Sequence, residues 1–76
     1  MENNFEKSLR LLGLTIAYQR KLKGLSQIDL AEKANISRTH ISNIEAPNGK
    51  TSVSLRTLFA IADALDISLY ELFKFK

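Results

Sequence analysis

Hydrophobic residues recur along this chain of 76 residues at the spacing of helices. In the N-terminal segment, apolar side chains stand at positions i, i+4, i+7 and i+11, which places them on one face of a helix. We predict that this face packs in the core. Gly24 suits the end of that helix, because glycine readily adopts a positive φ. The residues of the apolar face are Phe5, Leu9, Leu12 and Ile16.

Serine residues predict where four further helices begin. A serine before a segment of helical periodicity is typical of an N-cap, whose side-chain oxygen accepts a hydrogen bond from the first turn. Asp29 follows Ser26 by three residues, and Glu71 follows Ser68 by three, so both serines are predicted to form capping boxes. The predicted helices are 27–34, 38–45, 55–65 and 69 to about 74, which follow Ser26, Ser37, Ser54 and Ser68.

The connections complete an all-α prediction, because no segment shows a convincing strand pattern. Asn35 tolerates the left-handed conformation and is predicted to form a tight turn. Residues 46–53 contain Pro47 and Gly49 and are predicted to be a loop. We expect a compact five-helix bundle in one domain over residues 1–76, because a chain this short cannot hold two cores. The core face predicted for the fourth helix is Leu55, Leu58, Phe59, Ala62 and Leu65.

Residues 35–37 alone join the second and third predicted helices, so this pair is expected to cross steeply. Ala31 is small enough for the two helices to approach closely at its position. The pair forms a helix-turn-helix over about 26–45. Its predicted inward residues are Leu30, Ala34, Ile36, Ile41 and Ile44. Its outward residues are Gln27, Asp29, Glu32, Lys33, Arg38, Thr39, Ser42 and Asn43.

Composition argues against catalysis and against a membrane span. Cysteine is absent, and the chain has one histidine and three glycines, which leaves no disulfide, no cysteine or histidine metal site and no glycine-rich phosphate loop. The acidic residues form no isolated pair suited to acid–base work. We therefore expect no enzyme activity, no cofactor and no metal. Because neither a long apolar run nor a secretory signal is visible, we expect a cytoplasmic protein.

Positive charge is concentrated near the N-terminus. The net charge is +3, and residues 1–25 carry five basic against two acidic residues, whereas the remainder carries six of each. This balance permits nucleic-acid binding without requiring it.

The outward residues of the 38–45 helix suit double-stranded DNA. A helix about 10–12 Å across fits a major groove about 12 Å wide. Arg38 can pair with guanine and Asn43 with adenine, and Thr39 offers a hydroxyl and a methyl group. We expect these three residues to contact bases. Phosphate contacts are expected beside Gln27, at the unpaired N–H groups of its helix, and in the loop 48–52.

The string GLSQIDLAEKANISRTHISNIE, residues 24–45, resembles the helix-turn-helix of the Xre/Cro/phage-repressor family. The resemblance implies a lambda-repressor-like bundle with the 38–45 helix in the major groove. It also implies that Arg20 and Glu45 form a buried salt bridge. SRTHISNIE, residues 37–45, is similar to the recognition helix of restriction–modification controller proteins. The implied DNA backbone contacts are Gln27, Ser37, His40, Ser42, Asn48, Lys50 and Thr51.

Apolar residues beyond the needs of a core predict an interface. The first helix carries a second apolar stripe, and the last helix is rich in large apolar groups. We expect a homodimer that regulates transcription at an inverted repeat, with no small-molecule ligand. The alternative is a protein-interaction module of antitoxin or anti-repressor type that uses both apolar surfaces. The stripe is Leu11, Leu14, Tyr18 and Leu22, and the expected dimer interface is Leu69, Tyr70, Phe73 and Phe75.

Overall fold

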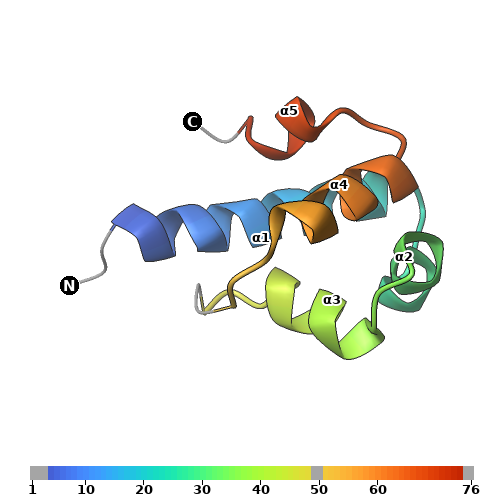
Figure 1. The fold of residues 1–76 in the computed structure, drawn as a ribbon, viewed down its shortest axis with the longest axis horizontal. Coiled ribbons are helices and arrows are strands. Elements are labelled where there is room, and N and C mark those ends of the chain that lie inside the picture. Colours follow the sequence, from blue (N-terminus) through green and yellow to red (C-terminus); the bar gives the residue numbers. More distant parts are fainter. Residues whose placement is uncertain (1–3, 49–50, 75–76) are drawn as a thin grey trace.

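The computed structural model describes residues 4–48 and 51–74, and within these ranges the chain forms five helices and no strand (Figure 1). The predicted all-α fold is therefore confirmed. The helices are α1 (Asn4–Leu22), α2 (Gln27–Ala34), α3 (Arg38–Glu45), α4 (Leu55–Ala64) and α5 (Leu69–Leu72).

The longest helix, α1, runs along the long axis of the molecule, and the other helices gather toward its C-terminal end (Figure 1). It packs against α3 and α5, whereas α2 packs against α3 and α4. As a result, α1 and α2 together cover the inner side of α3. Within the described residues, no other helix packs on the remaining side of α3.

The core lies where these helices meet. Most of the predicted inward residues of the helix-turn-helix are buried, and Ile36 is partly buried against the same cluster. Ala31 is buried at 4% exposure, in agreement with its predicted place at a close approach. The buried cluster comprises Leu12, Ile16, Leu30, Ala31, Ile41, Ile44, Leu58, Ile61, Ala62, Leu65 and Leu72.

Three residues that the periodicity placed in the core are exposed, and those predictions are wrong. Phe5 is 75% exposed because the first turns of α1 extend past the ends of the neighbouring helices (Figure 1). Leu55 and Phe59 are 59% and 55% exposed, because α4 is rotated so that Ile61 points into the core instead.

The predicted caps of α2, α3 and α4 are present. Ser26 and Asp29 form a reciprocal capping box, with the Asp29 N–H donating to the serine oxygen at 3.0 Å and the Ser26 N–H donating to the carboxylate at 2.9 Å. Ser37 accepts from the His40 N–H at 3.1 Å, and Ser54 caps α4 in the same way. Each helix therefore starts where its sequence predicted.

The C-terminal prediction is only partly right. Ser68 stands at the N-cap position of α5 but makes no side-chain cap hydrogen bond, so the predicted capping box with Glu71 is wrong. The Glu71 carboxylate instead lies 3.6 Å from the Lys74 ammonium group. The helix ends at Leu72 and not near Lys74, and α4 ends one residue earlier than predicted, with Leu65 as its C-cap.

Candidate nucleic-acid interface

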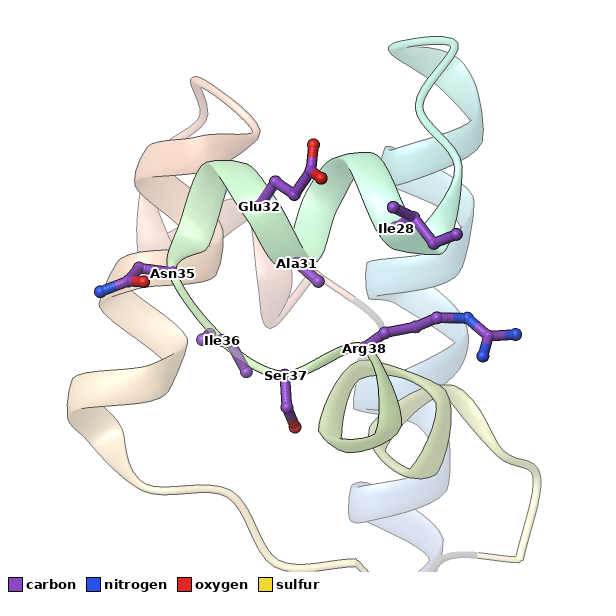
Figure 2. Close-up of a pocket in the computed structure, with 7 residues that line it drawn as sticks. All are labelled: Ile28, Ala31, Glu32, Asn35, Ile36, Ser37 and Arg38. Atoms are coloured by element: carbon purple, nitrogen blue, oxygen red, sulfur yellow. The ribbon is translucent and has the colours of Figure 1, made fainter.

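The turn between α2 and α3 depends on one left-handed residue. Asn35 adopts φ 56° and ψ 48°, a conformation that asparagine tolerates better than most residues. The Ile36 N–H then donates to the Ala31 carbonyl at 2.9 Å, while the Ile36 side chain packs against the core. In Figure 2, α2 lies across the view and α3 is seen almost end-on, so the two helices cross steeply, as predicted.

The outward face of α3 is polar and uncovered. Ile41, Ile44 and Glu45 point into the molecule and are buried. At 100° per residue, Thr39, Ser42 and Asn43 share the opposite side of the helix. No described segment packs over this side, which is the arrangement that contact with base edges requires. The exposed residues are Arg38, Thr39, Ser42 and Asn43.

Residues beside the outward face of α3 differ in how far their side chains are exposed and available to bind. Arg38 begins the helix and its side chain extends outward from the turn (Figure 2). His40 is half-buried on the other flank, and Ser37 is exposed but its oxygen is engaged in the cap. Of the expected base contacts, Arg38, Thr39 and Asn43 are therefore all on the surface.

An ion pair joins the inner side of α3 to α1. The Arg20 Nε donates to Glu45 Oε2 at 2.8 Å, and Nη2 donates to Oε1 at 2.8 Å, which makes the pair bidentate. The third guanidinium nitrogen, Nη1, donates to the Leu25 carbonyl at 2.8 Å. Both residues are 8% exposed, and the hydrogen bonds with Glu45 raise the pKa of Arg20 above its usual value. The salt bridge that the family resemblance implied is thus part of the structure.

Gln27 belongs to the same network, which its sequence position did not reveal. Its side-chain amide donates to Glu45 Oε1 at 3.0 Å and is half-buried. The first residue of α2 is thereby tied to the last residue of α3. Gln27 was expected to contact phosphate, and this hydrogen bond fixes where its remaining donor and acceptor can reach.

The N-terminus of α2 offers fewer donors than expected. The capping box occupies the N–H groups of Ser26 and Asp29, which leaves those of Gln27 and Ile28 for an outside acceptor. Hydrogen bonds from Ser26 lower the pKa of Asp29, so its carboxylate stays charged near this helix end. A phosphate that approaches the helix would therefore meet two free donors beside one negative charge.

A shallow depression of about 580 Å³ lies in the angle between α2 and α3 (Figure 2). Ile28, which is 52% exposed, and Glu32 line it from α2, and Arg38 lines it from α3. Because Glu32 contributes a carboxylate, the depression is poorly suited to hold a phosphate group. Its other lining residues are Ala31, Asn35, Ile36 and Ser37.

The remaining expected contacts lie on the loop after α3. Asn48 is exposed and Thr51 is half-buried, both on the segment that leads from α3 to α4. Lys50 lies outside the described residues.

The expected dimer interface is partly on the surface. Tyr70 is 68% and Phe73 is 41% exposed, whereas Leu69 packs against the core. Phe75 lies outside the described residues. The exposed Leu55 and Phe59 of α4, the helix that packs on α5, add apolar surface that the sequence had assigned to the core.

Two further features bear on the classes of function. No helix within 4–48 and 51–74 has both the length and the apolar character needed to cross a membrane. In the same ranges, no three histidine or acidic side chains gather in a way that could hold a metal ion.

Curated relatives match most of this chain. The HTH-type transcriptional regulator SinR of Bacillus subtilis (strain 168) is 37% identical over 62 residues, which cover 82% of this chain and 55% of SinR. The immunity repressor protein of Bacillus phage phi105 is 43% identical over 58 residues, which cover 76% of this chain and 39% of the repressor. The chain therefore spans about half the length of SinR and less of the phage repressor.

Solved structures match the fold. The restriction-modification controller protein C.AhdI from Aeromonas hydrophila superposes with a TM-score of 0.82 at 36% identity, covering 88% of this chain and 98% of that chain. SinR in complex with DNA superposes with a TM-score of 0.75 at 36% identity, covering 83% of this chain and 98% of that chain. The predicted similarity to controller proteins is confirmed. A family model described as "Helix-turn-helix" matches residues 16–72, and the chain belongs to this family.

Proposed function

We propose that the protein is a sequence-specific DNA-binding regulator of transcription, with α3 lying in the major groove. The observation that carries this proposal is the uncovered polar face of α3, which the Arg20–Glu45 pair holds from behind. SinR, whose fold this chain shares, has been solved in complex with DNA, which supports the same use here. In this role the protein is not an enzyme, needs no cofactor or small-molecule ligand and acts in the cytoplasm.

Each surface residue has a role in this proposal. Three side chains of α3 read base edges, whereas His40 and Ser42 of the same helix, the starts of α2 and α3 and the following loop hold the DNA backbone. The residues proposed to contact bases are Arg38, Thr39 and Asn43. Those proposed to contact the backbone are Gln27, Ser37, His40, Ser42, Asn48, Lys50 and Thr51.

The regulator is proposed to act as a homodimer. Two α3 helices related by a two-fold axis would enter successive major grooves about 34 Å apart and read an inverted repeat. The exposed apolar groups of α4, of α5 and of its C-cap residue Phe73 support an interface on that side of the molecule. Leu69, which packs against the core, and Phe75 are proposed to contribute to the same interface.

Selection of binding sites from random duplex DNA tests the proposal. The expected outcome is an enriched inverted repeat whose half-sites lie about one helical turn apart. The matched variant carries Thr39→Ala and Asn43→Ala, two changes on the exposed face that leave the core intact. It should fold with an unchanged circular dichroism spectrum and enrich a different or weaker sequence. If neither protein enriches any sequence, the proposal is wrong.

A protein-interaction module remains the second candidate. The observation in its favour is the exposure of Leu14, Tyr18 and Leu22 on α1, at 48%, 60% and 61%. Titration of the protein with random-sequence DNA at falling salt separates the two functions. A DNA-binding protein gains affinity as salt is lowered, because each phosphate contact releases counterions. A module that binds only proteins shows no affinity for DNA even at low salt.

A further inference from the structure

The side of α1 that faces away from α3 carries an apolar ridge. We define the outer ridge as Leu14, Tyr18 and Leu22, which are about half to three-fifths exposed. Their spacing of four residues aligns them along one line of the helix surface, about 12 Å from the first to the last at 1.5 Å per residue. Leu11 lies beside this line and is half-buried.

The opposite side of α1 is occupied by the fold itself. Leu12 and Ile16 are buried in the core, and Arg20 is held by Glu45 at the end of α3. Gly13 lies so close to α3 that a Cβ there would overlap the Ile44 carbonyl oxygen. Because α3 packs on this buried side, the outer ridge points away from the proposed DNA surface. A partner on the ridge would therefore leave α3 accessible.

The shape of the ridge fits another helix. Side chains four residues apart form a ridge that packs into the groove between two such rows on a second helix. A second helix of about three turns would match the length of the ridge. A membrane fits less well, because interfacial helices need a broad apolar face, whereas the ridge is a single row of three side chains and Leu12 and Ile16 are buried in the domain.

Charge around the ridge identifies the kind of helix. Residues 7–28 contain five basic residues and no acidic one. Of these, Arg20 is neutralised by Glu45, whereas Lys7 and Lys21 are exposed and lie on the ridge side of α1. A second copy of this chain would bring another basic helix to the ridge, with no acidic residue in 7–28 to complement these lysines. A partner with acidic residues beside its apolar row would complement them.

We propose that the outer ridge of α1 docks an acidic amphipathic helix of another protein, and that it does so while α3 is bound to DNA. Binding to the ridge rests on the exposed face of α1 alone. The simultaneous occupation of α3 rests on the proposed DNA-binding function. The two parts are therefore measured separately.

Two synthetic helical peptides serve as probes, identical in their apolar row and flanked by glutamates in one and by lysines in the other. Fluorescence anisotropy should show that the full chain binds the glutamate peptide at least about tenfold more tightly than the lysine peptide. A variant with Leu14→Ser and Leu22→Ser should lose about tenfold or more of that affinity. A variant with Lys7→Glu and Lys21→Glu should reverse the preference between the peptides.

A matched control removes equally exposed apolar groups elsewhere. Leu55→Ser with Phe59→Ser on α4 should leave peptide affinity unchanged, because these side chains are as exposed as the ridge but lie on another helix. Equal loss in the control and in the ridge variant would overturn the proposal. So would equal binding of both peptides, or a ridge variant that lost only self-association in sedimentation or only binding to vesicles of phosphatidylglycerol.

The DNA part uses the operator sequence recovered from random duplex DNA. Saturating glutamate peptide should leave operator affinity within about twofold and produce a ternary complex in a gel shift. Competition between peptide and operator would overturn simultaneous binding. If the chain bound no DNA, the peptide measurements would still decide the role of the ridge.

Discussion

The Arg20 guanidinium and the Glu45 carboxylate form two hydrogen bonds of 2.8 Å each, and these join the C-terminal end of α1 to the C-terminal end of α3. The side-chain amide of Gln27 donates to Glu45 Oε1 at 3.0 Å, so α2 is joined to the same carboxylate. The buried Glu45 carboxylate therefore fixes the positions of α1, α2 and α3 relative to one another. The orientation of the polar face of α3 depends on this anion as much as on the apolar core.

Removal of one partner from this pair should be costly. Arg20→Met would leave the Glu45 carboxylate buried without its cation, and we expect a loss of about 3–5 kcal/mol in the free energy of unfolding. Urea denaturation at pH 7 measures this loss. The control is Lys21→Met, an exposed neighbour on α1, which should change stability by less than about 0.5 kcal/mol. Equal effects of the two changes would contradict the importance of the pair.

The close approach of α1 and α3 makes a second prediction. A Cβ at Gly13 would overlap the Ile44 carbonyl oxygen and lie 3.2 Å from its carbonyl carbon, so Gly13→Ala must push the helices apart. We expect a loss of about 1–3 kcal/mol in stability, and weaker DNA binding by the folded variant because α3 is displaced.

Gly24→Ala is the control for that change. Gly24 has φ 71° and open space around its Cα, so alanine there costs about 1–2 kcal/mol through backbone strain alone. Because α3 is not moved, the affinity of the folded Gly24→Ala variant for DNA should be unchanged. Denaturation measures the stability of both variants, and gel shifts measure their DNA affinity. Together they distinguish backbone strain at residue 24 from displacement of α3. A Gly13→Ala protein with full DNA affinity would refute the displacement.

Local features of the fold were predictable because they depend on neighbouring residues. Ser26 and Asp29 are three residues apart, and that spacing predicted their capping box correctly, whereas the same spacing of Ser68 and Glu71 did not produce one. The rotation of α4 was not predictable in this way. Both the row containing Leu55 and Phe59 and the row containing Ile61 have helical spacing, and only the docking of α4 on its neighbours decides between them.

In the candidate site too, the local sequence pattern predicted some features and missed others. That the polar residues of α3 would face outward followed from its own pattern, in which Ile41 and Ile44 mark the inner side. The bond between Gln27 and Glu45 spans 18 residues and joins two helices, so it depends on how steeply they cross. No local pattern carries that information. The Arg20–Glu45 pair was anticipated only through the family resemblance.

Two serines at helix starts should differ in their contribution to stability. Ser37 accepts a hydrogen bond from the His40 N–H at 3.1 Å, so Ser37→Ala should cost about 1 kcal/mol. Ser68 occupies the same position on α5 without such a bond, and Ser68→Ala should change stability by less than about 0.5 kcal/mol. Thermal unfolding of the two variants compares them directly. A larger loss for Ser68→Ala would contradict the assignment of the caps.

Asp29 should make stability depend on acidic pH. The backbone N–H and side chain of Ser26 lower the pKa of Asp29 in the folded protein below the value near 3.9 of an unfolded chain. The resulting stabilisation is complete above the unfolded pKa and is lost as pH falls through the folded pKa. The difference in unfolding free energy between wild type and Asp29→Asn should therefore narrow from pH 6 to pH 2. Urea titrations at several pH values measure it, and a constant difference would contradict the capping role.

Arg38 and Lys50 should affect DNA binding in different ways. Arg38 extends from the exposed start of α3, where it can form a bidentate pair with guanine, so Arg38→Ala should relax preference at one base by about 1–3 kcal/mol. Lys50, expected to contact phosphate, should on replacement by alanine weaken binding to all sequences alike and reduce the salt dependence. Competition among single-base variants of the operator, at two salt concentrations, distinguishes these effects. If Arg38→Ala keeps the wild-type preference at every base, Arg38 does not read the sequence, and base recognition must then depend on Thr39 and Asn43.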